Sequence, residues 1–319
     1  MNVLVLAVES VITMLLLIGT GYYLSARKWF NQVNSGLIAK LVTNIALPAY
    51  MLHFILTDFS RDKLIHLAPG VVVPIVSIVI TMFVSFAFCK LLKVKDGRKG
   101  TFSSMFFNSN SVFIGIPLNL ALFGAESLPY VLLYYFANTF FFWTLGVQLI
   151  SKDGVGGNNS SGKTSFSTVA KKVINPPLIG FFLAVILLML NVKLPDFLMS
   201  YFKFTGNLTT PLSMLFIGIS IFFTGITSIK FTKDMLGILL GRFVIAPGIM
   251  ILIVWFLPLP LLMKQVFVMQ AAMPVMTNAP VVAKVNHADS EYAAIMVTVS
   301  TIASLFIVPI WMLIVQIIH

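Results

Sequence analysis

Long apolar segments follow one another along the whole chain, separated by short segments that hold most of the polar and basic residues. A helix needs about 20 apolar residues to cross the roughly 30 Å hydrocarbon core of a bilayer. The pattern therefore predicts an all-α membrane protein with about ten transmembrane helices. These are expected at residues 3–24, 36–56, 68–93, 101–123, 128–150, 173–191, 205–227, 234–257, 264–284 and 291–316.

Two predicted spans, the fourth and the ninth, contain amide, hydroxyl and proline residues near their middle. Proline donates no backbone hydrogen bond and its ring clashes with the preceding turn, so each helix is expected to break just before Pro117 or Pro280. Non-helical backbone at membrane depth is tolerated only where it is buried in protein or lines a cavity. An ordinary kinked helix with small polar residues against its neighbours is the alternative. The candidate binding residues are Asn108, Ser109, Asn110, Ser111, Gly115, Pro117, Pro274, Thr277, Asn278 and Pro280.

The two halves of the chain carry related segments at a constant separation of 163 residues. This favours an internal duplication, with a first repeat over residues 1–150, a linker over 151–172 and a second repeat over 173–319. Paired Pro/Gly-interrupted apolar segments at corresponding positions indicate a transporter's binding site. The matching pairs are Asn44 and Asn207, Pro48 and Pro211, Met51 and Met214, and Pro117 and Pro280.

Composition and charge agree with a membrane protein and predict its orientation. The chain is 59% hydrophobic and 10% charged, with a mean hydropathy of +1.00, outside the range of soluble domains. The net charge of +11 does not indicate nucleic-acid binding, because the basic residues lie at the ends of spans. Assigning the connections alternately to two sides places 16 of the 21 Lys and Arg residues on one side, which should be cytoplasmic. Both termini are then outside and the two five-span repeats are inverted.

Several sequence features argue against enzyme chemistry. Residues 157–164 fit the phosphate-loop pattern G-x-x-x-x-G-K-[ST], but that loop needs a buried strand before it and a helix after it. A linker after a membrane span provides neither, so no nucleotide is expected. The single cysteine, Cys89, excludes an internal disulfide and a cysteine-based metal site. No metal-ligand spacing or hydrolytic set stands out, so we expect no cofactor, no metal and no enzymatic activity.

Ionisable residues inside the predicted spans are candidates for ion coupling. Glu9 and His53 are the two candidates, although an interfacial carboxylate and a hydrogen-bonded structural histidine are the simpler interpretations. Arg242 is expected to extend its guanidinium to the cytoplasmic surface. Neither broken span contains Asp or Glu. Because a coupled cation usually needs such a charge, the pattern favours an electrogenic uniporter or anion exchanger.

The broken spans have a chemistry that suits anions. Pro117 and Pro280 are each expected at the first position of a new half-helix, where the missing N–H costs nothing. A helix start carries about +0.5 charge and free N–H groups, and so it binds carboxylate. Neutral amide and hydroxyl donors upstream, such as Asn110 and Asn278, would bind an anion without trapping it. The sequence therefore predicts a small-organic-anion site near the membrane midplane.

Four segments together resemble the auxin efflux carrier family, over essentially the whole chain: NSNSVFIGIPL, NIALPAYML, TTPLSMLFIG and AAMPVMTNAPVVAKVN, the last followed by EYAAIMVTVSTIASLFIVPIW. The family includes plant auxin exporters and bacterial malate or malonate permeases. The resemblance implies a 5+5 inverted repeat similar to bile-acid sodium symporters, with spans 4 and 9 crossing as unwound helices. It also implies a scaffold domain moving against a crossover domain, a homodimer, and binding of the substrate carboxylate by Asn110.

This chain departs from the plant members at two places. Ser109 stands where they place a proline, and Pro274 and Pro280 are one residue further apart. Together with the short central loop, these differences argue against auxin itself as the substrate. The sequence thus favours an alternating-access carrier of carboxylates such as malate or malonate in a bacterial cytoplasmic membrane. The alternatives are an exporter of auxin-like aromatic monocarboxylates, a proton or sodium symporter, and a membrane sensor. A channel would need a continuous polar lining rather than two polar breaks.

Overall fold

The computed structural model describes residues 3–154, 176–224 and 232–316. These residues form helices joined by short loops, with one isolated β-bridge between Ser109 and Val275. The α-helices are α1 (Val3–Ala26), α2 (Gln32–Leu41), α3 (Leu47–Asp58), α4 (Arg61–Leu67), α5 (Val72–Leu91), α6 (Lys99–Phe107), α7 (Ile116–Phe123), α8 (Leu128–Phe141), α9 (Val147–Lys152), α11 (Pro176–Met189), α12 (Asp196–Gly206), α13 (Thr209–Thr224), α14 (Lys233–Leu240), α15 (Ala246–Trp255), α16 (Leu261–Ala271), α17 (Ala279–Val285) and α18 (Ser290–Val315).

The apolar helices fall on the predicted spans. In the described part of the chain, six helices are long and apolar enough to cross a membrane: Gly36–Thr57, Ile65–Leu91, Ala125–Lys152, Asp196–Phe223, Lys233–Trp255 and Ser290–Val315. Shorter apolar helices lie at Leu15–Ala26, Ser111–Phe123, Ile179–Met189 and Leu261–Ala271, where the other four spans were predicted. The prediction of an all-α membrane protein is confirmed in this form, and the inverted five-plus-five arrangement stays a prediction.

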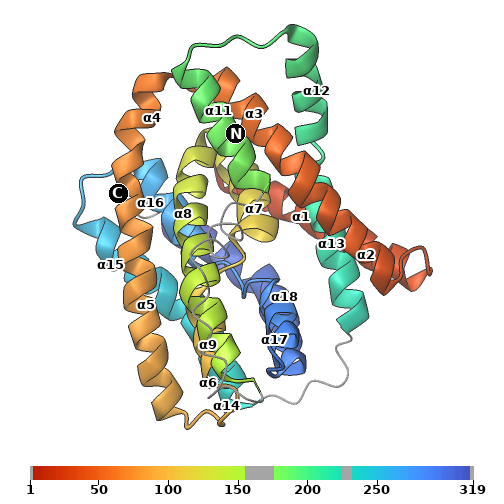
Figure 1. Ribbon diagram of the computed structural model, residues 1–319, viewed down its shortest axis with the longest axis vertical. Helices are drawn as coiled ribbons and strands as arrows, with labels where there is room; N and C mark the ends of the chain where they lie inside the picture. Colours follow the sequence, from red (N-terminus) through yellow and green to blue (C-terminus); the bar gives the residue numbers. More distant parts are fainter. Residues whose placement is uncertain (1–2, 155–175, 225–231, 317–319) are drawn as a thin grey trace.

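The helices pack in two sets, which we call the frame helices and the core helices. The frame helices are α1, α2, α3, α11, α12 and α13: α1 and α2 pack on α13, and α3 packs on α11 and α12. The core helices are α5 to α9 and α14 to α18, in which α5 contacts α6, α8 and α15, and α17 contacts α18. In Figure 1, α13 lies on the right and α5 and α15 on the left. The sets meet where α1 and α13 contact α7 and α18.

Close backbone contact joins two of the frame helices. A Cβ atom at Gly21 of α1 would overlap the carbonyl oxygen of Leu215 in α13, and one at Gly218 would overlap the carbonyl oxygen of Ile18. Small residues allow membrane helices to approach this closely, and van der Waals packing then holds them together. The two glycines therefore fix α1 against α13.

Five-residue π-helical segments precede three of the prolines. These segments are η1 (Val42–Ala46), η3 (Ser111–Gly115) and η6 (Gly241–Ile245), and the proline that follows each is the second residue of α3, α7 or α15. A proline cannot donate to the carbonyl four residues back and its ring crowds that carbonyl. The wider π turn moves the carbonyl away, so the helix continues instead of breaking.

The predicted break before Pro117 is therefore wrong in position. The helix that contains Pro117 already begins at Ser111, and the unwound residues are Asn108 to Asn110. In the ninth span the helix ends at Ala271 and restarts at Ala279, which makes Pro280 the second helical residue instead of the first.

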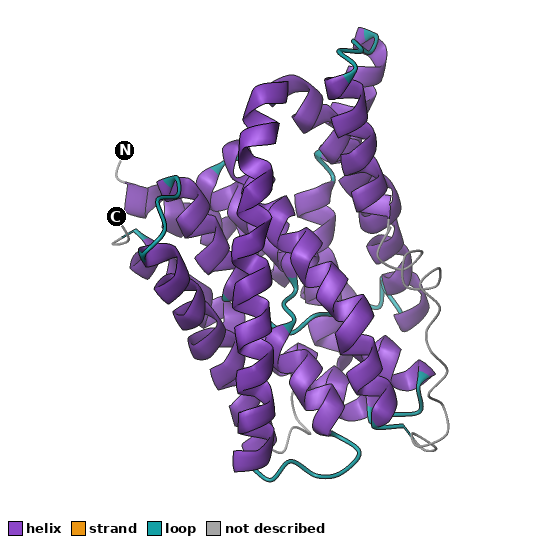
Figure 2. Ribbon diagram, turned by 60° about the vertical axis from the view of Figure 1, so that its left-hand side comes forward, coloured by secondary structure: helices purple, strands orange, loops and turns teal. Residues whose placement is uncertain are grey.

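The two unwound segments cross at the centre of the molecule. Asn110 donates its backbone N–H to the carbonyl oxygen of Pro274 at 2.8 Å, beside the bridge between Ser109 and Val275. Figure 2 shows these loop segments surrounded by helices. Backbone groups that lose their helical partners at membrane depth must be satisfied elsewhere. Here the two segments form backbone hydrogen bonds with each other, which makes the crossing one structural unit.

The ends of α5 and α9 and the starts of α6 and α14 lie together at the lower end of the molecule in Figure 1. This end carries Lys90, Lys93, Lys95, Lys99 and Lys152, and α12 lies at the opposite end. The basic end is the one that the charge bias predicts to be cytoplasmic.

Cysteine labelling tests this orientation. With Cys89 replaced by serine, a cysteine at the exposed Lys95 or at Asn159 should be protected from a membrane-impermeant thiol reagent in intact cells. A cysteine at Ser200, exposed in α12, should react. Labelling of all three positions after permeabilisation is the control. The reverse pattern in intact cells would contradict the orientation.

Candidate binding site

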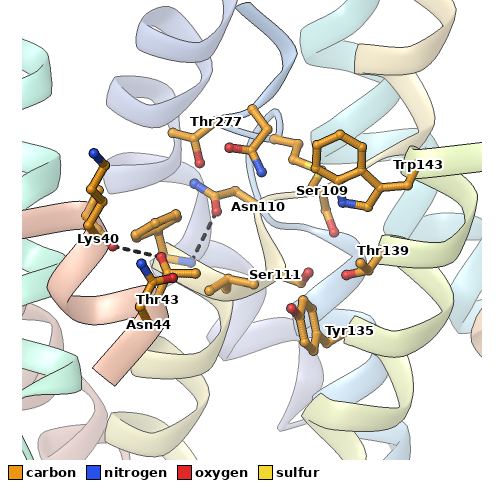
Figure 3. A pocket seen from close by; sticks show the side chains of 15 residues that line it. Lys40, Thr43, Asn44, Ser109, Asn110, Ser111, Tyr135, Thr139, Trp143 and Thr277 are labelled. Atoms are coloured by element: carbon orange, nitrogen blue, oxygen red, sulfur yellow. Dashed lines mark hydrogen bonds between the residues drawn. The ribbon is translucent and has the colours of Figure 1, made fainter. Parts of the chain in front are cut away.

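A cavity of about 320 Å³ lies against the crossing, between the frame and core helices (Figure 3). The frame contributes the end of α2 and η1, and the core contributes both crossing segments, α8 and η5 (Phe142–Gly146). The lining residues are Ala39, Lys40, Thr43, Asn44, Ser109, Asn110, Ser111, Val112, Phe113, Tyr135, Thr139, Trp143, Met276, Thr277 and Asn278.

The structure brings half of the sequence-predicted residues to this cavity. Ser109, Asn110, Ser111, Thr277 and Asn278 line it. The other five predicted residues do not, and they shape or brace the backbone of the crossing. Asn108 is buried, and its Nδ2 donates to the carbonyl oxygen of Ser104 at 3.1 Å. The carbonyl oxygen of Pro274 accepts from the backbone N–H of Asn110. The remaining three residues are Gly115, Pro117 and Pro280.

Asn110 has the geometry of a ligand-binding amide. It caps the helix that starts at Ser111, with its Oδ1 accepting from the backbone N–H of Phe113 at 3.2 Å. The residue is 2% exposed, and its Nδ2 finds no acceptor among the described residues. Figure 3 shows the Asn110 side chain on the cavity wall near Thr277. A buried N–H without a partner costs free energy, so a ligand oxygen is the natural acceptor.

Asn138 of α8 braces the unwound segment from behind. Its Oδ1 accepts from the backbone N–H of Ser109 at 2.9 Å, and its Nδ2 donates to the Ser109 carbonyl at 2.9 Å and to Ser111 Oγ at 3.2 Å. Asn138 is fully buried and replaces the helical partners that Ser109 has lost. Asn138 was not among the residues predicted from the sequence. Asn138 could have been found because it is an amide in the middle of an apolar span, where its side chain needs a hydrogen-bond partner from the protein.

Arg242, in η6, joins the two half-helices that end at the crossing. Its Nη1 donates to the carbonyl of Phe106 at 3.1 Å, its Nη2 to Ala271 at 2.6 Å and its Nε to Met273 at 3.0 Å. Phe106 and Ala271 lie in the last turns of α6 and α16, where the helix dipole places about −0.5 charge. The guanidinium is completely buried. The predicted extension of Arg242 to the surface is therefore wrong, because the carbonyls at the crossing bind it inside the protein.

The charge around the cavity is positive. Among the described residues that line it, Lys40 is the one charged residue and none is a carboxylate, and Arg242 lies behind the crossing. A site of this kind attracts anions and offers no charge to a cation.

Of the two predicted coupling residues, only His53 can be placed relative to the cavity. His53 is half-buried in α3 and does not line it. Glu9 belongs to α1, but its side chain lies outside the described residues. The phosphate-loop pattern at 157–164 also lies outside them. In the part of the chain that the structure describes, no group of three or more His, Cys, Asp or Glu residues could hold a metal ion.

Known proteins share the whole length of this chain. A family model described as membrane transport protein matches residues 6–312. An uncharacterized transporter of Methanothermobacter thermautotrophicus is 24% identical over 308 residues, which cover 95% of this chain and 96% of that protein. An uncharacterized transporter of Methanocaldococcus jannaschii is 23% identical over 316 residues, covering 95% and 97%. Because the family model spans nearly the entire sequence, this protein belongs to the membrane transport protein family, the auxin efflux carrier family that its motifs resemble.

Proposed function

We propose that this protein is a secondary transporter of small organic anions, with carboxylates such as malate or malonate as substrates. The observation that carries the proposal is Asn110, a buried helix-capping amide whose Nδ2 has no hydrogen-bond partner among the described residues and lies at a cavity that no described carboxylate lines. Behind the cavity, Arg242 adds a charge that stays positive at any physiological pH. The first turn of the helix from Ser111 to Phe123 adds the partial positive charge of its dipole.

The size of the cavity supports a small substrate. Ligand pockets for drug-sized molecules range from about 300 to 1,000 Å³, and this one is about 320 Å³. A short dicarboxylate suits such a volume. Tyr135 and Trp143 also line the cavity, and these aromatic side chains favour an aromatic monocarboxylate, as in auxin, as the second candidate.

The position of the cavity supports alternating access. One wall belongs to frame helix α2 and the other to the core helices, so sliding of the core against the frame would open the site to the other side. We propose that ten spans in two inverted repeats provide this motion, with both termini outside and the protein assembled as a homodimer. The rigid α1–α13 contact through Gly21 and Gly218 suits a frame that stays still.

Flux measurements in proteoliposomes test the transport function. Malonate inside the vesicles should exchange with external malonate at a rate that saturates with concentration. An imposed potassium-diffusion potential should change this exchange rate. Sodium should not be required, because none of the described residues that line the cavity is a carboxylate that could bind a coupled cation. Each elementary charge that moves across a membrane potential of 100 mV changes the free energy of transport by about 2.3 kcal/mol. Protein-free liposomes and unloaded vesicles are the controls. A strict sodium requirement, or proton coupling lost in Glu9→Gln or His53→Ala, would contradict uniport or exchange and assign coupling to those residues.

A further inference from the structure

Lys40 and Asn110 lie on opposite walls of the cavity. Lys40 belongs to α2 of the frame and Asn110 to the crossing in the core. In Figure 3 the Lys40 amine lies at the left edge of the cavity, and the Asn110 and Thr277 side chains lie between it and Trp143. Any molecule that reaches both residues contacts frame and core together.

The Lys40 ammonium is available to a ligand. Lys40 belongs to neither of the salt bridges that join Arg98 to Asp289 and Lys99 to Asp96 among the described residues. Lys40 is exposed and lines the cavity, and none of the described residues that share the lining is a carboxylate. The neighbouring Thr43 hydroxyl is already used, since it donates to the carbonyl of Ala39 at 2.8 Å. The frame wall therefore presents one cation as its main recognition group.

We propose that Lys40 binds the second carboxylate of a dicarboxylate whose first carboxylate is bound by Asn110. This inference rests on the proposed function and narrows its substrate class from organic anions to dicarboxylates. A monocarboxylate would leave either Lys40 or Asn110 without its anionic partner. A neutral tail next to Lys40 would also have to displace water from an ammonium without replacing its hydrogen bonds. Lys40 is thus a specificity-determining residue.

The test compares malonate with monomethyl malonate, which keeps the malonyl skeleton and replaces one charged carboxylate with a neutral methyl ester. Dissociation constants are measured by calorimetry on the purified full-length protein. Wild type should prefer malonate by roughly tenfold, the lower end expected for a hydrogen bond to a charged group. Lys40→Gln should lose that preference by weakening malonate binding and leaving the monoester unchanged, and Lys40→Arg should keep it. Lys90→Gln, which removes an exposed lysine outside this cavity, is the matched control and should behave like wild type.

The outcomes separate this inference from the function on which it rests. If wild type binds and transports neither compound nor any other carboxylate, the proposed function fails and the role of Lys40 fails with it. If wild type transports malonate but Lys40→Gln keeps the full malonate preference, only the role of Lys40 is overturned. A wild-type preference for the monoester or for an aromatic monocarboxylate would also overturn it. Thermal unfolding of each variant, expected to match wild type because Lys40 is exposed, shows that the change concerns binding.

Discussion

Replacing Arg242 with leucine is expected to destabilise the protein by about 3–6 kcal/mol. The change leaves the carbonyl oxygens of Phe106, Ala271 and Met273 buried without the donors that now satisfy them. Each orphaned acceptor costs about 1–3 kcal/mol, and the relief from no longer burying a charge offsets part of the sum. Because two of these carbonyls end α6 and α16, the half-helices should separate at the crossing. Thermal unfolding of the purified variant in detergent measures the effect.

Arg242→Lys is the matched control for this prediction. Lysine keeps the positive charge but cannot spread donors over three carbonyls as the planar guanidinium does. Its unfolding temperature should lie between those of wild type and Arg242→Leu. An Arg242→Leu protein that is as stable as wild type would mean that the crossing does not depend on this residue.

Asn110→Asp is expected to abolish malonate binding while the protein stays folded. Aspartate caps a helix as well as asparagine does, so the bond to the Phe113 N–H is kept. The substitution removes the free N–H donor and adds a negative charge where the substrate carboxylate would lie. Two like charges about 4 Å apart repel by about 4 kcal/mol at an effective dielectric constant of 20, which corresponds to roughly a thousandfold loss of affinity. Calorimetry and uptake into proteoliposomes measure it.

Three further variants show whether the effect belongs to the site. Asn110→Ala and Asn278→Ala remove a donor without adding charge, and each should weaken binding by about 10- to 150-fold. Asn191→Asp makes the same chemical change at an exposed position outside the cavity and should leave transport unaltered. Wild-type uptake by Asn110→Asp would show that the crossing is a structural break and not a binding site.

Much of the fold could be predicted from the sequence because it depends on local pattern. Apolar length set the positions of the spans, and the amides around Asn110 and Asn278 marked where helices unwind. The family was recognised from the same segments, and the family comparison confirms it. The position of the first break was wrong because Pro117 was treated as a helix breaker. The π turn over Ser111–Gly115 accommodates the proline instead, so a proline inside an apolar span does not by itself mark a break.

The missed residues all depend on contacts between distant parts of the chain. Lys40, Thr43 and Asn44 line the cavity because α2 and η1 lie beside a segment 65 or more residues later, which no pattern within the second span reveals. Asn138 and Arg242 meet the crossing from α8 and η6. Arg242 was assigned to the surface because exposed carbonyls at the ends of broken helices were not counted as its partners. Sequence reasoning can find such residues by asking which groups satisfy each unwound carbonyl.

The buried charge of Arg242 divides the electrical work of a transport cycle between its two half-cycles. In a carrier of the proposed kind Arg242 moves with the crossing, while Lys40 stays with the frame. The empty crossing then carries +1 through the membrane field, and the crossing loaded with a dianion carries −1. The charge moved in a complete cycle is still that of the dianion, so an inside-negative potential assists outward movement of the loaded carrier and also inward return of the empty one. Each half-cycle gains about 2.3 kcal/mol per 100 mV if the full field is crossed. Neither step is left to oppose the voltage, which makes outward delivery of a dianion the favoured direction of turnover.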